Sequence, residues 1–179
     1  MDHGVRIGGR RVHDDGARAR PPAERRAGAA AGPYQVDVLK AFGPKIAKAR
    51  AHTKVPILLP AKLPLLDPLK AYTSVTATRN AYELEIDAAP GCHGANACFV
   101  ATFSGERGGK LPFKANARLA TGDPAAFHGF SCGGSCSPDS FWYTHKGVLY
   151  EFQVKDFPQK SPKATFVRLA NEAIAAGPR

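Results

Sequence analysis

Four cysteines in two close pairs are the residues of this sequence whose types and spacing could do chemistry. Cys92 and Cys98 enclose His-Gly-Ala-Asn-Ala, and Cys132 and Cys136 enclose Gly-Gly-Ser. Cysteines this close together form disulfides, bind a metal as thiolates or act as a redox pair. If all four form disulfides, they can be paired in three ways.

Local pairing, Cys92 with Cys98 and Cys132 with Cys136, is the arrangement that we predict. The small residues around each pair let the backbone bend until the Cα atoms are within the roughly 4.4–6.8 Å that a bridge requires. Loops this short restrict the unfolded chain little, so each bridge should stabilise by less than the typical value of about 2–4 kcal/mol. An even number of cysteines without a Cys-x-x-Cys motif fits an oxidising compartment.

Zinc binding is the alternative for the same side chains. The cysteines, together with His93, His128 and His145, include enough thiolate and imidazole groups for a tetrahedral zinc site. However, the common zinc ribbons and fingers usually have two residues between paired ligands, which neither cysteine pair has. Redox cysteines normally lie at a helix N-terminus, whereas these adjoin expected strands. We therefore predict disulfides, with no metal and no cofactor, and keep zinc as the alternative.

Other candidate binding residues lie in two short stretches. Ser-Gly-Glu-Arg at residues 104–107 places the carboxylate of Glu106 beside the guanidinium of Arg107, as in an oligosaccharide or phosphate site, although a turn with a local ion pair explains the stretch as well. Trp142 and Tyr143 belong to an aromatic stretch, and an outward-facing tryptophan could stack on a sugar or a base, although such a residue is more often in the core. We predict no catalytic residue, because the metalloprotease HExxH, the phosphate-binding GxxxxGK[ST] and the dinucleotide-binding GxGxxG motifs are absent.

The elements that must position these residues begin with a helix over residues 36–52. Its apolar residues recur at steps of three and four, with a kink or a break into two short helices expected at Gly43-Pro44. Prolines 56, 60, 64 and 68 then exclude a helix, and Ile57 to Leu59 should form a short edge strand or a buried connector.

From residue 71 onwards the sequence repeats with a period of two residues, which predicts strands. We expect a hairpin of residues 71–78 and 82–87 and a third strand over residues 97–105, in which Phe99, Ala101 and Phe103 share a face. A long loop should follow over residues 105–125. The best-marked hairpin turns at Lys146-Gly147, with Val148, Tyr150, Phe152 and Val154 on one face.

A C-terminal helix should begin at Ser161-Pro162 and end at Gly177. The order of elements predicts an α+β fold, an antiparallel β-sheet meander with an N-terminal and a C-terminal helix packed on the sheet. We expect residues 1–33, which are rich in Arg, Ala, Gly and Pro, to be a disordered tail, and residues 34–179 to be a single domain.

The charge of the chain permits acidic partners without indicating one. The formal net charge is +10, and residues 1–33 contain seven arginines and four acidic residues. Beyond them, basic and acidic residues are interspersed, as on an ordinary solvated surface. No apolar run reaches the roughly 18 residues of a transmembrane helix, and the N-terminal stretch lacks the apolar core of a signal peptide.

Four stretches of the chain resemble a family of uncharacterised, often exported bacterial proteins with two cysteine-pair blocks. The stretches are TKVPILLPAKLP, GCHGANACFVATFSGER, SCGGSCSPDSFWYTHKGVLYEFQVK and FVRLANEAIAAG, and they fall within residues 50–177. More distantly, the chain resembles extracytoplasmic domains of unknown function in lipoproteins and anti-sigma factors. The resemblance implies a small sheet-plus-helix sensor or binding module and brings no functional residues with it.

These observations together predict a non-enzymatic extracytoplasmic binding or sensor-like domain with two local disulfides. We expect it to be periplasmic or secreted, although no leader is present in this sequence. An anionic envelope polymer or a protein is the expected partner. The alternatives are a zinc protein that uses the Cys/His set and a basic nucleic-acid-binding protein, of which nucleic acid is the less favoured.

Overall fold

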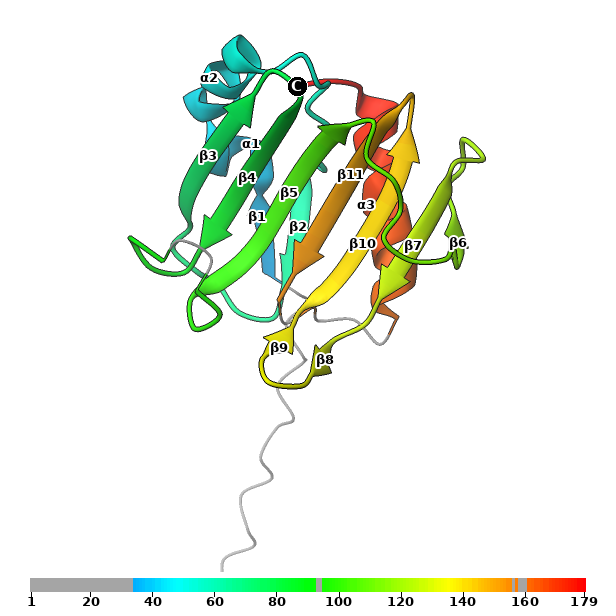
Figure 1. Cartoon of the computed structure of the whole chain (residues 1–179). Helices are drawn as coiled ribbons and strands as arrows, with labels where there is room; N and C mark the ends of the chain where they lie inside the picture. Colours follow the sequence, from blue (N-terminus) through cyan, green and yellow to red (C-terminus); the bar gives the residue numbers. More distant parts are fainter. Residues whose placement is uncertain (1–33, 93–94, 156, 158–160) are drawn as a thin grey trace, which may run out of the picture. The chain divides into compact units, whose positions relative to one another are not determined.

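A seven-stranded antiparallel sheet forms the centre of the structure (Figure 1). The computed structural model describes residues 34–92, 95–155, 157 and 161–179, so the predicted tail, residues 1–33, lies outside the described residues. The elements are, in chain order, β1 (Tyr34–Asp37), α1 (Val38–Phe42), α2 (Pro44–His52), β2 (Lys62–Leu65), β3 (Tyr72–Thr78), β4 (Ala81–Asp87), β5 (Phe99–Arg107), β6 (Ala117–Arg118), β7 (Pro124–His128), β8 (Ser131–Cys132), β9 (Cys136–Ser137), β10 (Asp139–His145), β11 (Val148–Val154) and α3 (Pro162–Ala176).

The strands are arranged as two meanders that meet in the middle of the sheet. The strand order is β3-β4-β5-β11-β10-β7-β6, so the chain leaves β5, crosses to the far edge and returns strand by strand to β11. The pairing of β5 with β11 joins the two halves, with Phe103 opposite Phe152. The predicted α+β class, an antiparallel sheet with helices near both ends of the chain, is confirmed.

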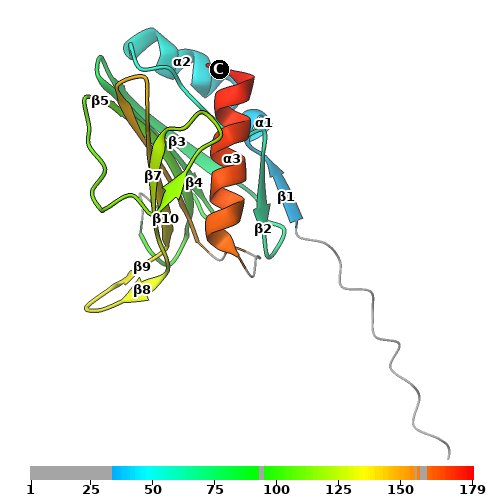
Figure 2. The ribbon, with the colours of Figure 1, turned by 90° about the vertical axis from the view of Figure 1, so that its right-hand side faces the viewer.

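The helices all lie on one side of the sheet (Figures 1 and 2). Phe42 of α1 contacts Phe103 at a ring-centroid distance of 6.5 Å, and Phe166 of α3 stacks on Phe141 of β10 at 5.7 Å. The ribbon of β1 and β2 lies on the same side as these helices. None of the helices that the structure describes lies over the opposite side of the sheet, and we call that side the open face.

The N-terminal helix is broken where the sequence predicted. Gly43 has a φ of +48°, ends α1 and precedes α2, which starts with Pro44. Asp37 caps α1 by accepting a hydrogen bond from the backbone N–H of Lys40 at 2.9 Å. The predicted start of the helix at residue 36 is wrong, because Val36 pairs with Leu63 in the β1–β2 ribbon, and this tertiary contact outweighs local helix preference.

The proline-rich segment is not helical, as predicted. Ile57 to Leu59 are fully buried and form a connector rather than an edge strand. The strand of this segment is β2, which includes Pro64 and pairs only with β1 in its two-stranded ribbon. Both hairpins and the C-terminal helix are confirmed, although the side chain of Ser161 makes no capping hydrogen bond with the described residues of that helix.

Two details of the predicted strands are wrong. The pairing of β4 with β5 is irregular after Ile86, so Phe99 faces Asp87 on the open face while Val100 enters the core. The predicted loop over residues 105–125 is also shorter, because β5 continues through Arg107 and β6 and β7 occupy part of the segment. These residues pair with strands distant in sequence, which no local pattern reveals.

Candidate functional site

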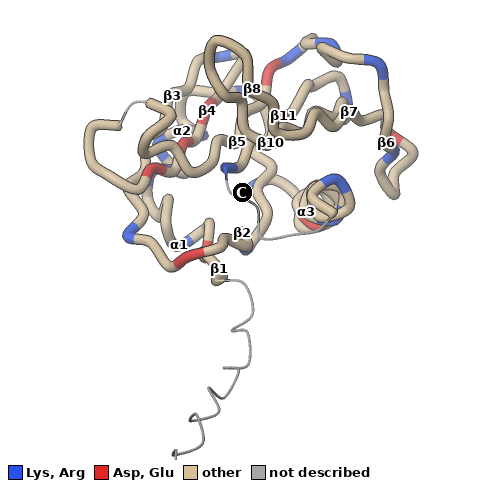
Figure 3. The backbone as a smooth tube through the Cα atoms, turned by 90° about the horizontal axis from the view of Figure 1, so that it is seen from below, with Lys and Arg blue, Asp and Glu red and all other residues tan. Residues whose placement is uncertain are grey.

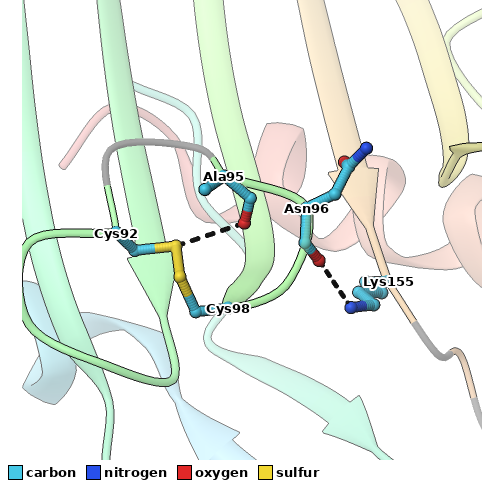
Figure 4. Close-up of a disulfide and its surroundings, with 5 residues drawn as sticks. All are labelled: Cys92, Ala95, Asn96, Cys98 and Lys155. Atoms are coloured by element: carbon cyan, nitrogen blue, oxygen red, sulfur yellow. Dashed lines mark hydrogen bonds between the residues drawn. A yellow bond between two sulfur atoms is a disulfide. The ribbon is translucent and has the colours of Figure 1, made fainter. Parts of the chain in front are cut away.

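The cysteines form the two predicted local disulfides. Cys92 is bonded to Cys98 in the loop between β4 and β5, and Cys132 is bonded to Cys136 across the small β8–β9 ribbon. The sulfur of Cys92 also lies 3.3 Å from the carbonyl oxygen of Ala95, which is a contact rather than a hydrogen bond because a disulfide sulfur carries no proton (Figure 4). The bridges therefore shape two loops next to the sheet.

Asn96 ties the two disulfide loops together. Its side-chain Nδ2 donates to the backbone carbonyl of Cys136 at 3.2 Å, and its own carbonyl accepts from Nζ of Lys155 at 2.7 Å. Figure 4 shows this second contact beside the Cys92–Cys98 bridge. Both loops are thus held at the same end of the sheet, where β11 ends.

The zinc alternative loses its main ligands in this arrangement. All four sulfurs are bonded in pairs and cannot act as thiolates. Of the histidines, His145 lies 2.6 Å from Asp123 and His128 stacks on Phe113, while His93 lies outside the described residues. Within the described ranges, no group of three or more His, Cys, Asp or Glu side chains could hold a metal ion.

The open face concentrates acidic and hydroxyl side chains along neighbouring strands. The register places Glu83, Ser104, Glu151 and Trp142 in one row across β4, β5, β11 and β10. Glu85 begins the adjacent row. Figure 3 marks acidic positions in red along the backbone, including those of β4. Since directly opposed residues of antiparallel strands share a face, these side chains are neighbours on one surface.

A pocket of about 270 Å³ lies between these side chains on the open face, and we call it the acidic pocket. Its lining residues come from β4, β5 and β11 and from the first disulfide loop, and they are Glu83, Glu85, Asn96, Phe99, Thr102, Glu151 and Gln153. Three carboxylates, two amides and a hydroxyl group can all accept hydrogen bonds there. The pocket is therefore suited to a ligand that donates them.

Two of the glutamates are shielded from solvent, Glu85 as a buried residue and Glu151 as a partly buried one. Glu85 is only 8% exposed, and its Oε1 has no hydrogen-bond partner among the residues that the structure describes. Burial raises the pKa of Glu151 above its usual range, the nearby charge of Glu83 adds to this, and a hydrogen bond from Trp142 opposes it. A buried carboxylate oxygen without a partner, as in Glu85, and a carboxylate whose pKa is raised by burial, as in Glu151, are both features that mark candidate functional sites.

An aromatic cluster of Phe113, His128 and Trp142 adjoins the acidic pocket. Phe113 comes from the segment between β5 and β6, is 49% exposed and lies 5.3 Å from the ring of Trp142 and 5.2 Å from that of His128. Trp142 is half-buried and is the direct neighbour of Glu151. The open face therefore combines an apolar, aromatic part with a negatively charged part.

The structure separates the four residues that the sequence singled out for binding. Glu106 and Trp142 both belong to the open face. Arg107 belongs to the other face, where its guanidinium donates to the carbonyl of Lys54 at 3.0 Å and so holds the segment after α2. Tyr143 is 0% exposed and lies in the core, and burial raises its pKa.

Sequence reasoning missed the three glutamates of the acidic pocket. Their signal was present, since Glu83, Glu85 and Glu151 are the polar members of alternating strands, but such residues usually point into solvent. It also missed the contact between Nδ1 of His145 and the carboxylate of Asp123, at 2.6 Å. Burial acts to raise the pKa of Asp123, but hydrogen bonds from Thr121 and His145 hold that pKa below its usual range.

One Gly-x-Ser-x-Gly pattern does occur, at residues 129–133. In hydrolases this pattern marks a nucleophile on a sharp turn between a strand and a helix. Here Ser131 is an exposed residue of β8, and the next described element is the strand β9 rather than a helix. The pattern therefore has no catalytic context in this fold.

Comparisons with models of known families, with curated proteins and with solved structures find no match to this chain. Fold and site together define a class, a disulfide-bonded α+β protein with an acidic and aromatic open sheet face. None of the helices among the described residues is long and apolar enough to cross a membrane.

Proposed function

We propose that this protein is a non-catalytic extracytoplasmic binding domain that holds its partner against the open face of the sheet. The observation that carries the proposal is the combination of the buried, unpartnered carboxylate oxygen of Glu85 with an aromatic cluster in which Phe113 is exposed, on a sheet face that no described helix covers. Aromatic side chains beside well-placed polar groups are the usual composition of a recognition surface.

The disulfides support the extracytoplasmic part of the proposal. Bridges of this kind persist in oxidising compartments and are rare in the reducing cytosol. The resemblance of the cysteine blocks to those of exported bacterial proteins favours the same compartment. Two structural bridges within one small domain are hard to maintain elsewhere.

The charge of the open face favours a protein over an anionic polymer as the partner. Glu83, Glu85 and Glu151 would repel phosphate or uronate groups brought to this face, in spite of the net charge of +10. The same repulsion argues against nucleic acid at this surface. A partner with basic and apolar side chains is complementary to it.

The compartment is tested on protein taken from its natural cells and alkylated before lysis. We expect all four cysteines to be protected as disulfides and the protein to be recovered with exported or envelope material. Four alkylated thiols in a cytosolic fraction would contradict the proposal.

Binding is tested by passing cell-envelope extract over the immobilised full-length chain. Ser104→Arg, which places a large cation between Glu83 and Glu151, should abolish recovery of the bound partner. Glu172→Gln on α3, away from the open face, should leave recovery as in the wild type. Equal recovery by both variants would show that the open face is not the binding surface.

A further inference from the structure

We propose that the acidic pocket is a guanidinium site that receives an arginine side chain of a protein partner. This inference rests on the proposed function, because it names the chemistry by which the open face recognises that partner. Glu85 is the buried carboxylate of its lining, with Glu83 on the same strand and Glu151 two strands away.

The first support is the state of Glu85. This side chain is more than nine-tenths buried, it lines the pocket, and its Oε1 finds no hydrogen-bond partner within the described part of the chain. Proteins rarely leave a buried carboxylate oxygen unsatisfied, because desolvation then goes uncompensated. The Oε1 is shielded from solvent, so a donor that enters the pocket would supply the missing hydrogen bond after a rotation of the Glu85 carboxylate.

The spacing of the carboxylates favours an extended cation over a metal ion. Glu83 and Glu151 lie on strands separated by β5, so their backbones are about 10 Å apart. No three ligand side chains among the described residues converge on one point where a metal could sit. A ligand whose donors are spread over several atoms fits carboxylates arranged around a pocket.

A guanidinium group meets this requirement better than an ammonium group. It presents five N–H donors in a plane and pairs with a carboxylate through two parallel hydrogen bonds, whereas an ammonium is a compact point charge. The pocket also offers Thr102 and Gln153 as neutral acceptors and the ring of Phe99 in its wall. Arginine stacks on aromatic rings more readily than lysine does.

The size of the pocket indicates a single side chain rather than a whole small molecule. Its volume of about 270 Å³ is below the range of roughly 300–1,000 Å³ that is typical of small-molecule sites. The aromatic cluster continues the surface beside Glu151 and can contact the residues that flank the arginine. The pocket and the cluster together suit an arginine presented on a peptide segment.

The test is a titration of the full-length chain with N-acetyl-arginine amide, followed by NMR. Trp142 is the only tryptophan, so its single indole N–H signal reports on its neighbour Glu151 without ambiguity. We expect this signal and the backbone signals of Glu85 and Thr102 to shift in a saturable way. The citrulline amide, which has the same shape without the charge, should cause no saturable shift, and the lysine amide should bind several-fold more weakly.

Two variants assign the binding to the pocket. Glu85→Gln should weaken binding at least tenfold, and Glu83→Gln, at an exposed position where folding is not at risk, should weaken it severalfold. Glu172→Gln on α3 should bind as the wild type does. The absence of a saturable shift, equal binding of the citrulline or lysine amide, or unchanged binding in both pocket variants would overturn the guanidinium site.

The seven arginines of residues 1–33 are the chain's own candidates for the pocket, and the test has to exclude them. Replacing all seven by glutamine should leave the affinity for the arginine amide unchanged. Tighter binding in that variant would show that the chain's own arginines compete for the pocket, and would overturn the assignment to a partner.

Failure of this inference can be told apart from failure of the proposed function. If the arginine amide does not bind but recovery of an envelope partner is still lost in Ser104→Arg, the open face binds through other chemistry and only the guanidinium site is wrong. If neither binding is observed, both proposals are wrong.

Discussion

Glu151 shows at the scale of one residue how the open face departs from an ordinary solvated surface. It is partly buried between β5 and β10, faces the charge of Glu83 and accepts a hydrogen bond from Trp142. Burial and the nearby charge raise its pKa, so the folded protein holds a proton there more tightly than the unfolded chain does. The charged form of Glu151 therefore costs stability, as is common where residues serve binding.

Glu151→Gln should stabilise the protein at neutral pH. Between the usual glutamate pKa of about 4.3 and the raised pKa of the folded state, the native protein binds more protons, so wild-type stability falls as pH rises through this window. The glutamine variant lacks this loss and should gain about 0.5 kcal/mol or more at pH 7, with no gain below the window.

This prediction is measured by urea unfolding at a series of pH values. Glu106→Gln, an exposed change on the same face, is the matched control and should stay within about 0.5 kcal/mol of the wild type at pH 7. A destabilised Glu151→Gln variant at neutral pH would show that the charge of Glu151 is compensated after all.

At the scale of elements, the disulfides act on loops and not on the sheet. Cys132–Cys136 closes the two-stranded β8–β9 ribbon, which is exposed along its whole length and is not part of the large sheet. Its one side-chain link to the first disulfide loop is the hydrogen bond from Asn96 among the described residues. The bridge therefore sets the shape of the rim near the acidic pocket.

Replacing Cys132 and Cys136 by serine should disorder the β8–β9 ribbon and leave the sheet intact. The loop is short, so the free energy of unfolding should fall by less than about 2 kcal/mol. Hydrogen exchange should increase at residues 129–138 and at Asn96, but not in β5 or β11. Ser135→Ala, which keeps the bridge, is the control, and unfolding of the whole domain by the double variant would contradict this view.

At the scale of the whole molecule, aromatic side chains join the helical layer to the sheet. Phe166 of α3 is fully buried and contacts Phe141 of β10, Phe127 of β7 and Phe157, at ring-centroid distances of 5.7, 6.0 and 4.8 Å. The core lies between this helix and the strands. The packing of α3 therefore takes place on the face opposite to the open face.

Phe166→Ala should destabilise the protein by about 3–5 kcal/mol, because it leaves a cavity between α3 and the sheet. Phe166→Leu keeps most of the volume and should cost less than about 2 kcal/mol. Both values are measured by denaturant unfolding of the full-length chain. A small loss for the alanine variant would show that α3 is not needed to hold the two layers together.

Much of the local structure could be predicted from the sequence. Alternation identified the strands of both hairpins, and Gly43-Pro44 identified the break between the two N-terminal helices. The β1–β2 ribbon and β6 could not be predicted, because short strands are stabilised by partners distant in the chain rather than by their own residues.

The candidate site was predictable only in part, for the same reason. Trp142 and Glu106 were recognised as residues that could bind, whereas Glu83, Glu85 and Glu151 looked like ordinary solvent-facing positions. Alternation assigns a side chain to a face, but it does not say which strands lie next to each other on that face.

The sequence by itself determined the two hairpins, the break between the N-terminal helices, the C-terminal helix and the pairing of cysteines that are only six and four residues apart. Only the tertiary structure decided the strand order, in which β11 returns to lie beside β5. That order places Glu151 on the same face as Glu83 and Glu85, with β5 between them, and so creates the acidic pocket. The physical reason is that the strands adopt the order that buries the apolar face of the sheet. This burial depends on all strands together and not on the residues of any one strand.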